Sequence, residues 1–475
     1  MSLSHRTVTR YALVLSMIVA PALFVSAPLA LTTPASAHTA HEPVYQASAA
    51  TTPALDFRDD MRALWEDHVG WTRLYIISVF GNLPDKDMVA QRLLRNQDDI
   101  GNAIKPYYGE AAGNQLTTLL REHITGADEL LKAAKAGDTP GIEAGKNRWY
   151  TNADQIAAFL EGANPTAWNR HMIASTMKMH LDLTLEEAVA RLQGDWSADV
   201  AAYDQIHEHI LTFADALSIG IIRQFPDRFT PAPPDAQVTF RNETRKAWED
   251  HIIWTRLFIV SALADLPDVE AATQRLLQDQ VDIGNLVKPY YGEAAGNQLT
   301  ALLRDHILGA AELLDAAKRG DTEAVQAASD TWYANGDDIA VFLNSANPTS
   351  WPLESVKAEM KMHLDLTLEE AVAHMKGEYE TDIARYDQIH HHILDLADTL
   401  SSGVIAQFPE KFAGSTGAGA AAVGQQHSPA STMAGMPRTG HAAGDEFSLV
   451  WPVALGGLLL LATGWLAVKH RSQRR

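Results

Sequence analysis

The sequence predicts an all-α protein: two tandem homologous helical-bundle domains, followed by a C-terminal transmembrane helix. Three observations lead to this prediction. Residues 57–229 and 240–412 align without a gap at an offset of 183, and 103 of the 173 aligned positions are identical. Apolar residues recur at steps of three and four through both copies, which is the spacing of a buried helix face. An apolar segment long enough to cross a bilayer, residues 447–468, stands near the C-terminus.

The N-terminal 37 residues have the layout of a secretory signal peptide. Residues 1–10 contain two arginines, residues 11–31 are mostly apolar, and residues 35–37 read Ala-Ser-Ala. A basic region, an apolar core and a small-residue cleavage site in this order are typical of export. We therefore expect the mature chain to begin at His38, with a polar leader over residues 38–55.

The two bundle domains are expected at residues 56–230 and 239–413, with a Pro-rich linker at 231–238. Each copy is long enough for its own core, so we expect one copy to fold alone. Proline and glycine interrupt the apolar periodicity of the first copy at Pro84, Pro106, Gly137 and elsewhere. The helices expected between these breaks are 56–82, 85–105, 109–136, 139–162, 167–181 and 183–224.

The C-terminal region predicts a membrane-anchored surface protein. Residues 414–446 are rich in Gly, Ala and Ser, which indicates a disordered stalk. The 22 residues of 447–468 can span a hydrocarbon core of about 30 Å as a helix. Residues 469–475 are basic, and basic flanks stay in the cytoplasm, so the predicted domains lie outside the cell.

A short motif precedes the predicted membrane helix. Met436, Pro437, Arg438, Thr439 and Gly440, together with the apolar segment and the basic tail, resemble the LPXTG-type cell-wall sorting signal recognised by sortases. The resemblance implies cleavage between Thr439 and Gly440 and transfer of the Thr439 carboxyl group to a cell-envelope polymer. Met436 stands where that family usually has leucine. The alternative is a plain single-span anchor in which the chain stays intact.

Composition narrows the possible partners and chemistry. The chain has no cysteine, which excludes disulfides and thiolate metal sites. Its net charge of −21 disfavours nucleic acid as a partner. We find no phosphate-binding loop, nucleophile elbow or paired catalytic carboxylates, so an enzyme is the least supported class.

Histidines occupy the apolar faces of four expected helices in each copy. A buried polar side chain costs free energy unless it has a partner, so these imidazoles should meet one another, water or an ion. We hypothesise a divalent-metal site in each bundle, to which an Asp three residues before the last histidine could add a carboxylate. The candidate ligands are His68, His123, His180, His207 and Asp204 in the first copy, and His251, His306, His363, His390 and Asp387 in the second.

The alternative is that these histidines only pack and form hydrogen bonds, in which case the protein is a structural or adhesive surface display protein. Two sequence blocks bear on the protein class: residues 65–73, which recur at 248–256, and residues 179–190, which recur at 362–373. They resemble those of uncharacterised exported bacterial helical domains. That resemblance implies export and an α-helical fold, and it implies no activity.

Overall fold

The computed structural model describes residues 52–229 and 235–413, and every regular element within these ranges is helical. The all-α prediction is therefore confirmed. The predicted signal peptide, stalk, sorting motif and membrane helix lie outside the described residues. Among the helices that are described, none combines the length and the apolarity needed to cross a lipid bilayer.

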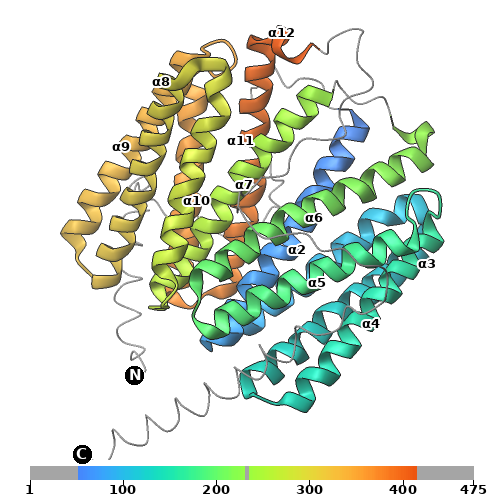
Figure 1. Cartoon of the computed structure of the whole chain (residues 1–475). Coiled ribbons are helices and arrows are strands. Elements are labelled where there is room, and N and C mark those ends of the chain that lie inside the picture. Colours follow the sequence, from blue (N-terminus) through green and yellow to red (C-terminus); the bar gives the residue numbers. More distant parts are fainter. Residues whose placement is uncertain (1–51, 230–234, 414–475) are drawn as a thin grey trace, which may run out of the picture.

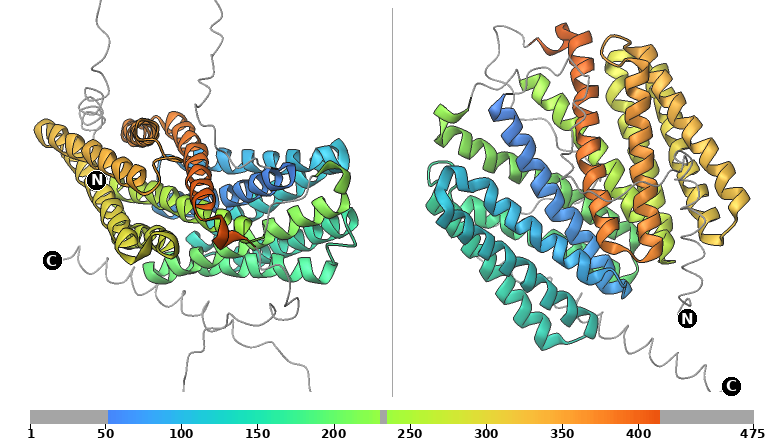
Figure 2. Two further views of the ribbon diagram at one scale, coloured as in Figure 1. Left: turned by 90° about the horizontal axis from the view of Figure 1, so that it is seen from above. Right: turned by 180° about the vertical axis from the view of Figure 1, so that it is seen from behind.

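Five long helices occur in the same order in each half of the chain, with lengths of 29, 51, 25, 24 and 29 residues. The first half is α2–α6 and the second half is α7–α11, and the two lie side by side (Figures 1 and 2). A short helix follows each half. The bounds are α2 Pro53–Gly81, α3 Lys86–Ala136, α4 Thr139–Ala163, α5 Arg170–Gln193, α6 Trp196–Gln224, η1 Pro226–Arg228, α7 Asp235–Leu263, α8 Val269–Arg319, α9 Thr322–Ala346, α10 Leu353–Lys376, α11 Tyr379–Gln407 and α12 Pro409–Phe412.

Helix α3 is two antiparallel arms joined at Gly109. This glycine has φ 84° and ψ 167°, a conformation that reverses the chain and that side chains with a Cβ rarely adopt. The arms pack closely, because a Cβ atom on Gly101 would lie 2.8 Å from the carbonyl oxygen of Gly113. Further along the arms, Arg121 Nη1 donates to the Leu94 carbonyl at 3.0 Å. The expected break near Pro106 is thus present, three residues further on.

One expected boundary is wrong. The sequence predicts one helix that ends at residue 181 and another that begins at 183, whereas α5 continues to Gln193 and α6 begins at Trp196. Gly194 ends α5 in the left-handed conformation, with φ 72°, and the Asp195 side chain caps α6 by accepting from the Ala198 N–H. The apolar spacing continues across this turn, so periodicity alone did not reveal it.

The two halves share a buried interface centred on two arginines. The guanidinium of Arg73, on α2, stacks between the rings of Tyr203 from its own half and Trp254 from the other, 4.8 and 4.9 Å from the two centroids. It donates to Glu187 at 2.8 Å and to Asp199 at 3.1 Å. Arg73 is 2 % exposed, so this charge depends entirely on its partners.

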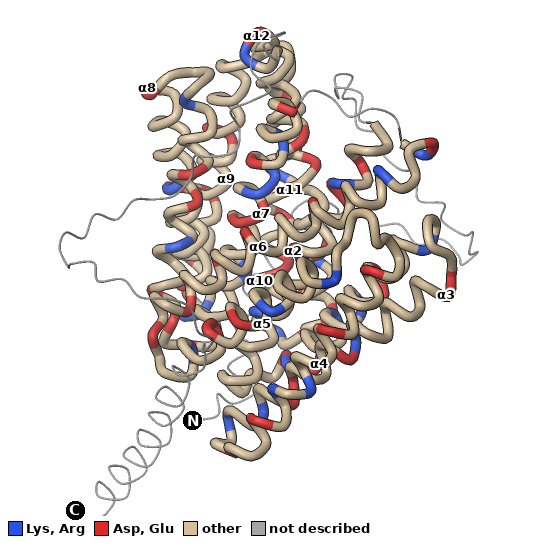
Figure 3. The backbone as a smooth tube through the Cα atoms, turned by 45° about the vertical axis from the view of Figure 1, so that its right-hand side comes forward, with Lys and Arg blue, Asp and Glu red and all other residues tan. Residues whose placement is uncertain are grey.

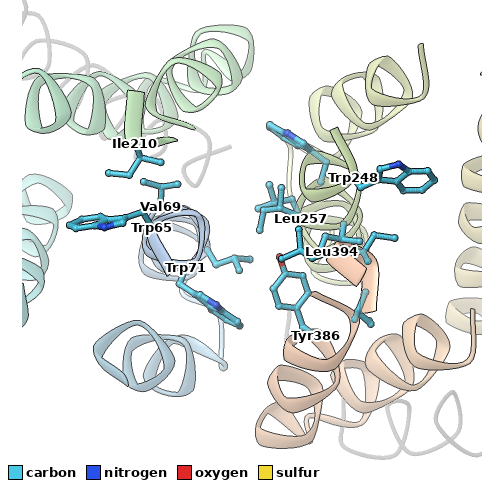
Figure 4. Close-up of a cluster of buried hydrophobic side chains, with 14 of the residues drawn as sticks. Trp65, Val69, Trp71, Ile210, Trp248, Leu257, Tyr386 and Leu394 are labelled. Carbon is cyan, nitrogen blue, oxygen red and sulfur yellow. The ribbon is translucent and has the colours of Figure 1, made fainter. Parts of the chain in front are cut away.

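The second half repeats the arrangement. Arg256 lies over Trp71 of the first half and Tyr386 of the second, at 5.1 and 4.9 Å. Its Nη1 donates to Glu370 at 2.7 Å and to Asp382 at 2.8 Å. Trp71 and Tyr386 face each other across the interface in Figure 4, where Trp65 and Trp248 point away from it, each into its own half.

Charged residues of both signs also occur where the halves meet (Figure 3). Arg191 donates to Asp268 across the interface at 2.6 Å, and Arg241 donates to Asp59 at 2.7 Å. One continuous cluster of buried apolar side chains includes residues from both halves. The division into two domains that fold independently therefore stays a prediction.

Replacing Arg73 by Met should lower the free energy of unfolding by about 3–5 kcal/mol, because the buried Glu187 would then lose its cation and Asp199 would keep only Arg191. Urea denaturation of the full chain measures this loss. The control is Arg58→Met, whose longer pair with the partly exposed Asp215, at 3.4 Å, is worth less than about 1 kcal/mol. Equal effects of the two substitutions would contradict the importance assigned to the buried arginine.

Candidate metal centre

Three of the predicted histidines meet inside the first half. His68 comes from α2, His123 from the second arm of α3 and His180 from α5, and all three are buried. One ring nitrogen can be chosen from each so that all three atoms lie within 4.8 Å of one another. The ring centroids are 5.5 to 6.3 Å apart. We call these residues the histidine triad.

Neighbouring aromatic rings hold two rings of the triad in place. Trp65, one turn before His68 on α2, packs edge-on against the His68 ring at 5.5 Å. Trp149 of α4 lies 5.3 Å from the His123 ring. Both tryptophans are buried, so neither imidazole can rotate without displacing a large side chain.

An asparagine on α4 sets the tautomer of His123. Asn152 Nδ2 donates to the Leu119 carbonyl at 3.0 Å, which turns its Oδ1 toward the ring. Oδ1 only accepts, so the His123 Nδ1 at 3.0 Å must be the donor. The lone pair of His123 is then on Nε2. A hydrogen bond that fixes the second ring nitrogen in this way is the usual outer shell of a metal-bound histidine.

Two other nitrogens of the triad are buried and unsatisfied. Nδ1 of His68 and Nδ1 of His180 have no hydrogen-bond partner among residues 52–229 and 235–413. Leaving a buried polar atom unpaired costs about 1–3 kcal/mol, and native proteins usually avoid it. A bound ligand would satisfy both atoms.

A cavity of about 10 Å³ adjoins the triad, which is room for about one water-sized particle. Its described lining includes aromatic and aliphatic side chains and no carboxylate. His209 of α6 also lines it, and its ring stacks 6.2 Å from that of His180. His209 is not among the predicted ligands, because it lies two positions after His207 and outside the apolar stripe that contains His207.

Burial keeps the triad neutral. Desolvation lowers the pKa of His68 to about 3, with a further contribution from His123, and it lowers the pKa of His123 to about 4. The pKa of His180 is also well below its ordinary value, because of burial and then of the neighbouring histidines. Neutral imidazoles with free lone pairs are the form that binds a metal ion.

The structure places the other two candidates of the first half elsewhere. His207 lies at the interface between the halves, with Nδ1 2.9 Å from Asp250 and Nε2 3.2 Å from Glu66. Asp204 accepts from Arg275 of the second half at 2.9 Å. Both side chains are therefore engaged in contacts that leave them outside the triad.

In the second half, His390 and Asp387 occupy matching interface positions. His390 Nε2 lies 2.6 Å from Glu249, and its Nδ1 lies 3.4 Å from Asp67. Asp387 accepts from Arg92 at 2.9 Å. The remaining predicted ligands come together as in the first half, with ring centroids 5.7 to 6.4 Å apart, and they are His251, His306 and His363.

No protein-family model, no curated protein and no solved structure matches this chain.

The interface histidines predict how stability depends on pH. Burial alone would lower the pKa of His207, but Asp250 and Glu66 outweigh it and raise the pKa to about 9. The pKa of His390 is raised for the same reason by Glu249 and Asp67. A raised histidine pKa stabilises the fold fully below the unfolded value of about 6.5, and this stabilisation is lost as the pH rises toward 9.

We therefore expect the free energy of unfolding to fall by roughly 3 kcal/mol for His207 alone between pH 6.5 and 9. Urea denaturation midpoints over this range measure the slope. The control is His207→Gln, which cannot take up a proton and should have a shallower slope because the His207 contribution is missing. Identical slopes for the two proteins would show that His207 is not protonated in the folded state.

Proposed function

We propose that this protein binds a transition-metal ion through His68, His123 and His180. The observation that supports this most strongly is the convergence of three buried imidazoles, from three different helices, with ring nitrogens within 4.8 Å of one another. Two of these rings carry a buried Nδ1 with no partner among the described residues. Packing alone gives no reason to bury these two nitrogens unpaired, because an apolar side chain would fill the same space at lower cost.

The ligand set selects the kind of ion. Neutral imidazoles suit Zn²⁺, Cu²⁺, Ni²⁺ and Fe²⁺, whereas Ca²⁺ and Mg²⁺ require oxygen ligands. Zn–N bonds are about 2.0–2.1 Å, so tetrahedral ligands stand roughly 3.4 Å apart. The ring nitrogens of the triad lie within 4.8 Å of one another, so binding an ion would draw them closer together. Three protein ligands leave a fourth coordination position, next to the cavity, for water or a second small ligand.

We further propose that the two halves are homologous domains of an exported protein, displayed on the cell surface by the C-terminal anchor. Support comes from the signal-peptide layout of residues 1–37, the motif at 436–440, the apolar segment 447–468 and the basic tail. The implied partners are a sortase, the envelope polymer that it modifies and the membrane. A metal-binding protein on the cell surface would bind its ion before that ion enters the cell.

His123→Ala should reduce binding of Zn²⁺ by the first half to background, because two imidazoles cannot hold the ion alone. Elemental analysis and thermal melting on the same samples of the full chain measure binding and folding together. The control is His171→Ala, which removes an exposed histidine from α5 and should change neither. A wild-type chain that stays metal-free and gains no thermal stability from zinc, copper, nickel or iron would contradict the proposal.

The asparagine behind the triad gives a graded test. Asn152→Leu removes the hydrogen bond that fixes the His123 ring and should weaken metal binding about 10- to 100-fold. Histidine ligands with an ordinary pKa would lose a metal ion below about pH 6, where they become protonated. With the pKa of His68 and His123 lowered to about 3 and 4, uptake by the wild-type chain should instead persist at pH 5. Competition with a chromogenic chelator at pH 5 and pH 7 measures both effects.

Processing is tested separately. If a sortase acts, the mature surface protein should end at Thr439 and should be released by a peptidoglycan hydrolase; mass spectrometry of the C-terminal peptide checks this. Thr439→Ala should leave the chain intact and membrane-bound. Recovery of residues 440–475 in the wild-type surface protein would support the plain single-span anchor instead.

A further inference from the structure

The histidine triad is buried, so an ion must pass between other side chains to reach it. His68, His123 and His180 are 2–6 % exposed. Of the described side chains that line the adjoining cavity, all are buried except Thr176 of α5 and His209 of α6, which are partly exposed. The cavity therefore comes nearest to solvent between α5 and α6, which lie side by side (Figure 1).

A hydrogen bond joins the two residues at this edge of the cavity. His209 Nε2 lies 3.1 Å from the carbonyl oxygen of Thr176. A carbonyl oxygen only accepts, so Nε2 carries the hydrogen and the lone pair of the neutral ring is on Nδ1. Nδ1 has no hydrogen-bond partner among residues 52–229 and 235–413. Neutral His209 therefore has a lone pair that is free to bind a metal ion.

His209 also stands next to a ligand of the proposed site. Its ring stacks on that of His180, with the centroids 6.2 Å and the planes 15° apart. This separation falls within the 5.5–6.3 Å found inside the triad. His209 is not, however, in the group of histidines whose ring nitrogens all lie within 4.8 Å of one another. It is placed beside the ligands that would hold the ion and is not one of them.

The surroundings of His209 leave it freer to reorient than the triad. Buried tryptophans pack against two of the triad rings. Among the described residues, the ring contact of His209 is with His180 alone, and its side chain reaches solvent. Side chains that reach solvent change rotamer rapidly, whereas packed core rings do so only when their neighbours move.

The second half repeats this pair of rings. His392 is the equivalent of His209, and its ring stacks on that of His363 at 6.1 Å. Glu359 stands where the first half has Thr176, and its carboxylate lies 3.4 Å from His392 Nδ1. His392 is buried, at 7 % exposure, so the argument from solvent access applies to His209 alone.

A divalent ion needs a ligand where it leaves the solvent. Removing water from a charged species is costly unless protein groups replace the lost water. The described lining of the cavity contains no carboxylate, and the Thr176 hydroxyl already donates to the Met172 carbonyl at 3.0 Å. An imidazole at the edge can replace one water molecule of the ion, and it is a ligand type that transition-metal ions accept.

We infer that His209 is the transfer ligand of the first-half site: it binds the ion at the cavity edge between α5 and α6 and passes it to His180 and the rest of the triad. This inference rests on the proposed metal-binding function. Because the ion stays on His209 only during transfer, His209 governs how fast the ion enters and leaves, and the triad governs how tightly it is held. The ions concerned are those that suit the triad, divalent transition metals that bind imidazole.

The test measures Zn²⁺ exchange on the full chain carrying His306→Ala, which disables the second-half histidines so that the exchange belongs to the first half. Stopped-flow absorbance of a chromogenic chelator follows uptake of free Zn²⁺ and its release into excess chelator. Adding His209→Ala should slow both processes roughly tenfold, because entry then requires the helices to move apart. The dissociation constant should stay unchanged, because a transfer ligand lowers the barrier equally in both directions.

A second substitution separates a ligand from a plug. His209→Phe fills the position with a ring that has no lone pair, whereas His209→Ala leaves the position open. Loss of a transfer ligand slows loading in both variants, but loss of a mere plug would make the alanine variant load faster. His209→Phe also decides the question if the alanine variant does not fold. The control is His171→Ala, which removes an exposed histidine from α5 and should change neither rate.

Each outcome has a distinct meaning. A folded His306→Ala chain that binds no Zn²⁺ defeats the proposed function itself. If Zn²⁺ binds and His209→Ala loads as fast as its parent or faster, the proposed function stands and the inference is overturned. A fall in affinity at an unchanged loading rate would make His209 a fourth ligand of the bound ion, which likewise overturns its role in transfer.

Discussion

The arrangement of this molecule depends on two buried guanidinium groups at the interface between its halves. Arg73 and Arg256 each receive carboxylates from their own half and an indole face from the other half. A buried charge cannot lose its partners without a cost of several kcal/mol, and the tryptophan of the other half is one of the groups that cover each guanidinium. This reciprocity explains why α2 and α7, which carry the two arginines, are buried on nearly every side.

A helix that is buried on every side packs against two sets of neighbours, which here are its own bundle and the other half. On α2, Glu66, Gly70 and Arg73 follow at steps of four and three along the face toward the second half, whereas Trp65 and His68 lie on the face toward their own bundle. The same side chains that fix the interface therefore fix the rotation of α2 about its axis. That rotation directs His68 toward His123 and His180, so the interface and the candidate metal site are not independent features.

This double burial also limits what the sequence could predict. Steps of three and four identified helices and buried positions well, and proline marked the break near Pro106. The same spacing turned His68, His123 and His180 toward the core, whereas a shared site was a hypothesis that also included His207 and Asp204. Periodicity reports that a residue is buried and does not report what it is buried against. His207 was therefore grouped with the triad, although the acidic side chains around it belong partly to the other half. His209 was missed because α6 has two buried faces and only one was recognised.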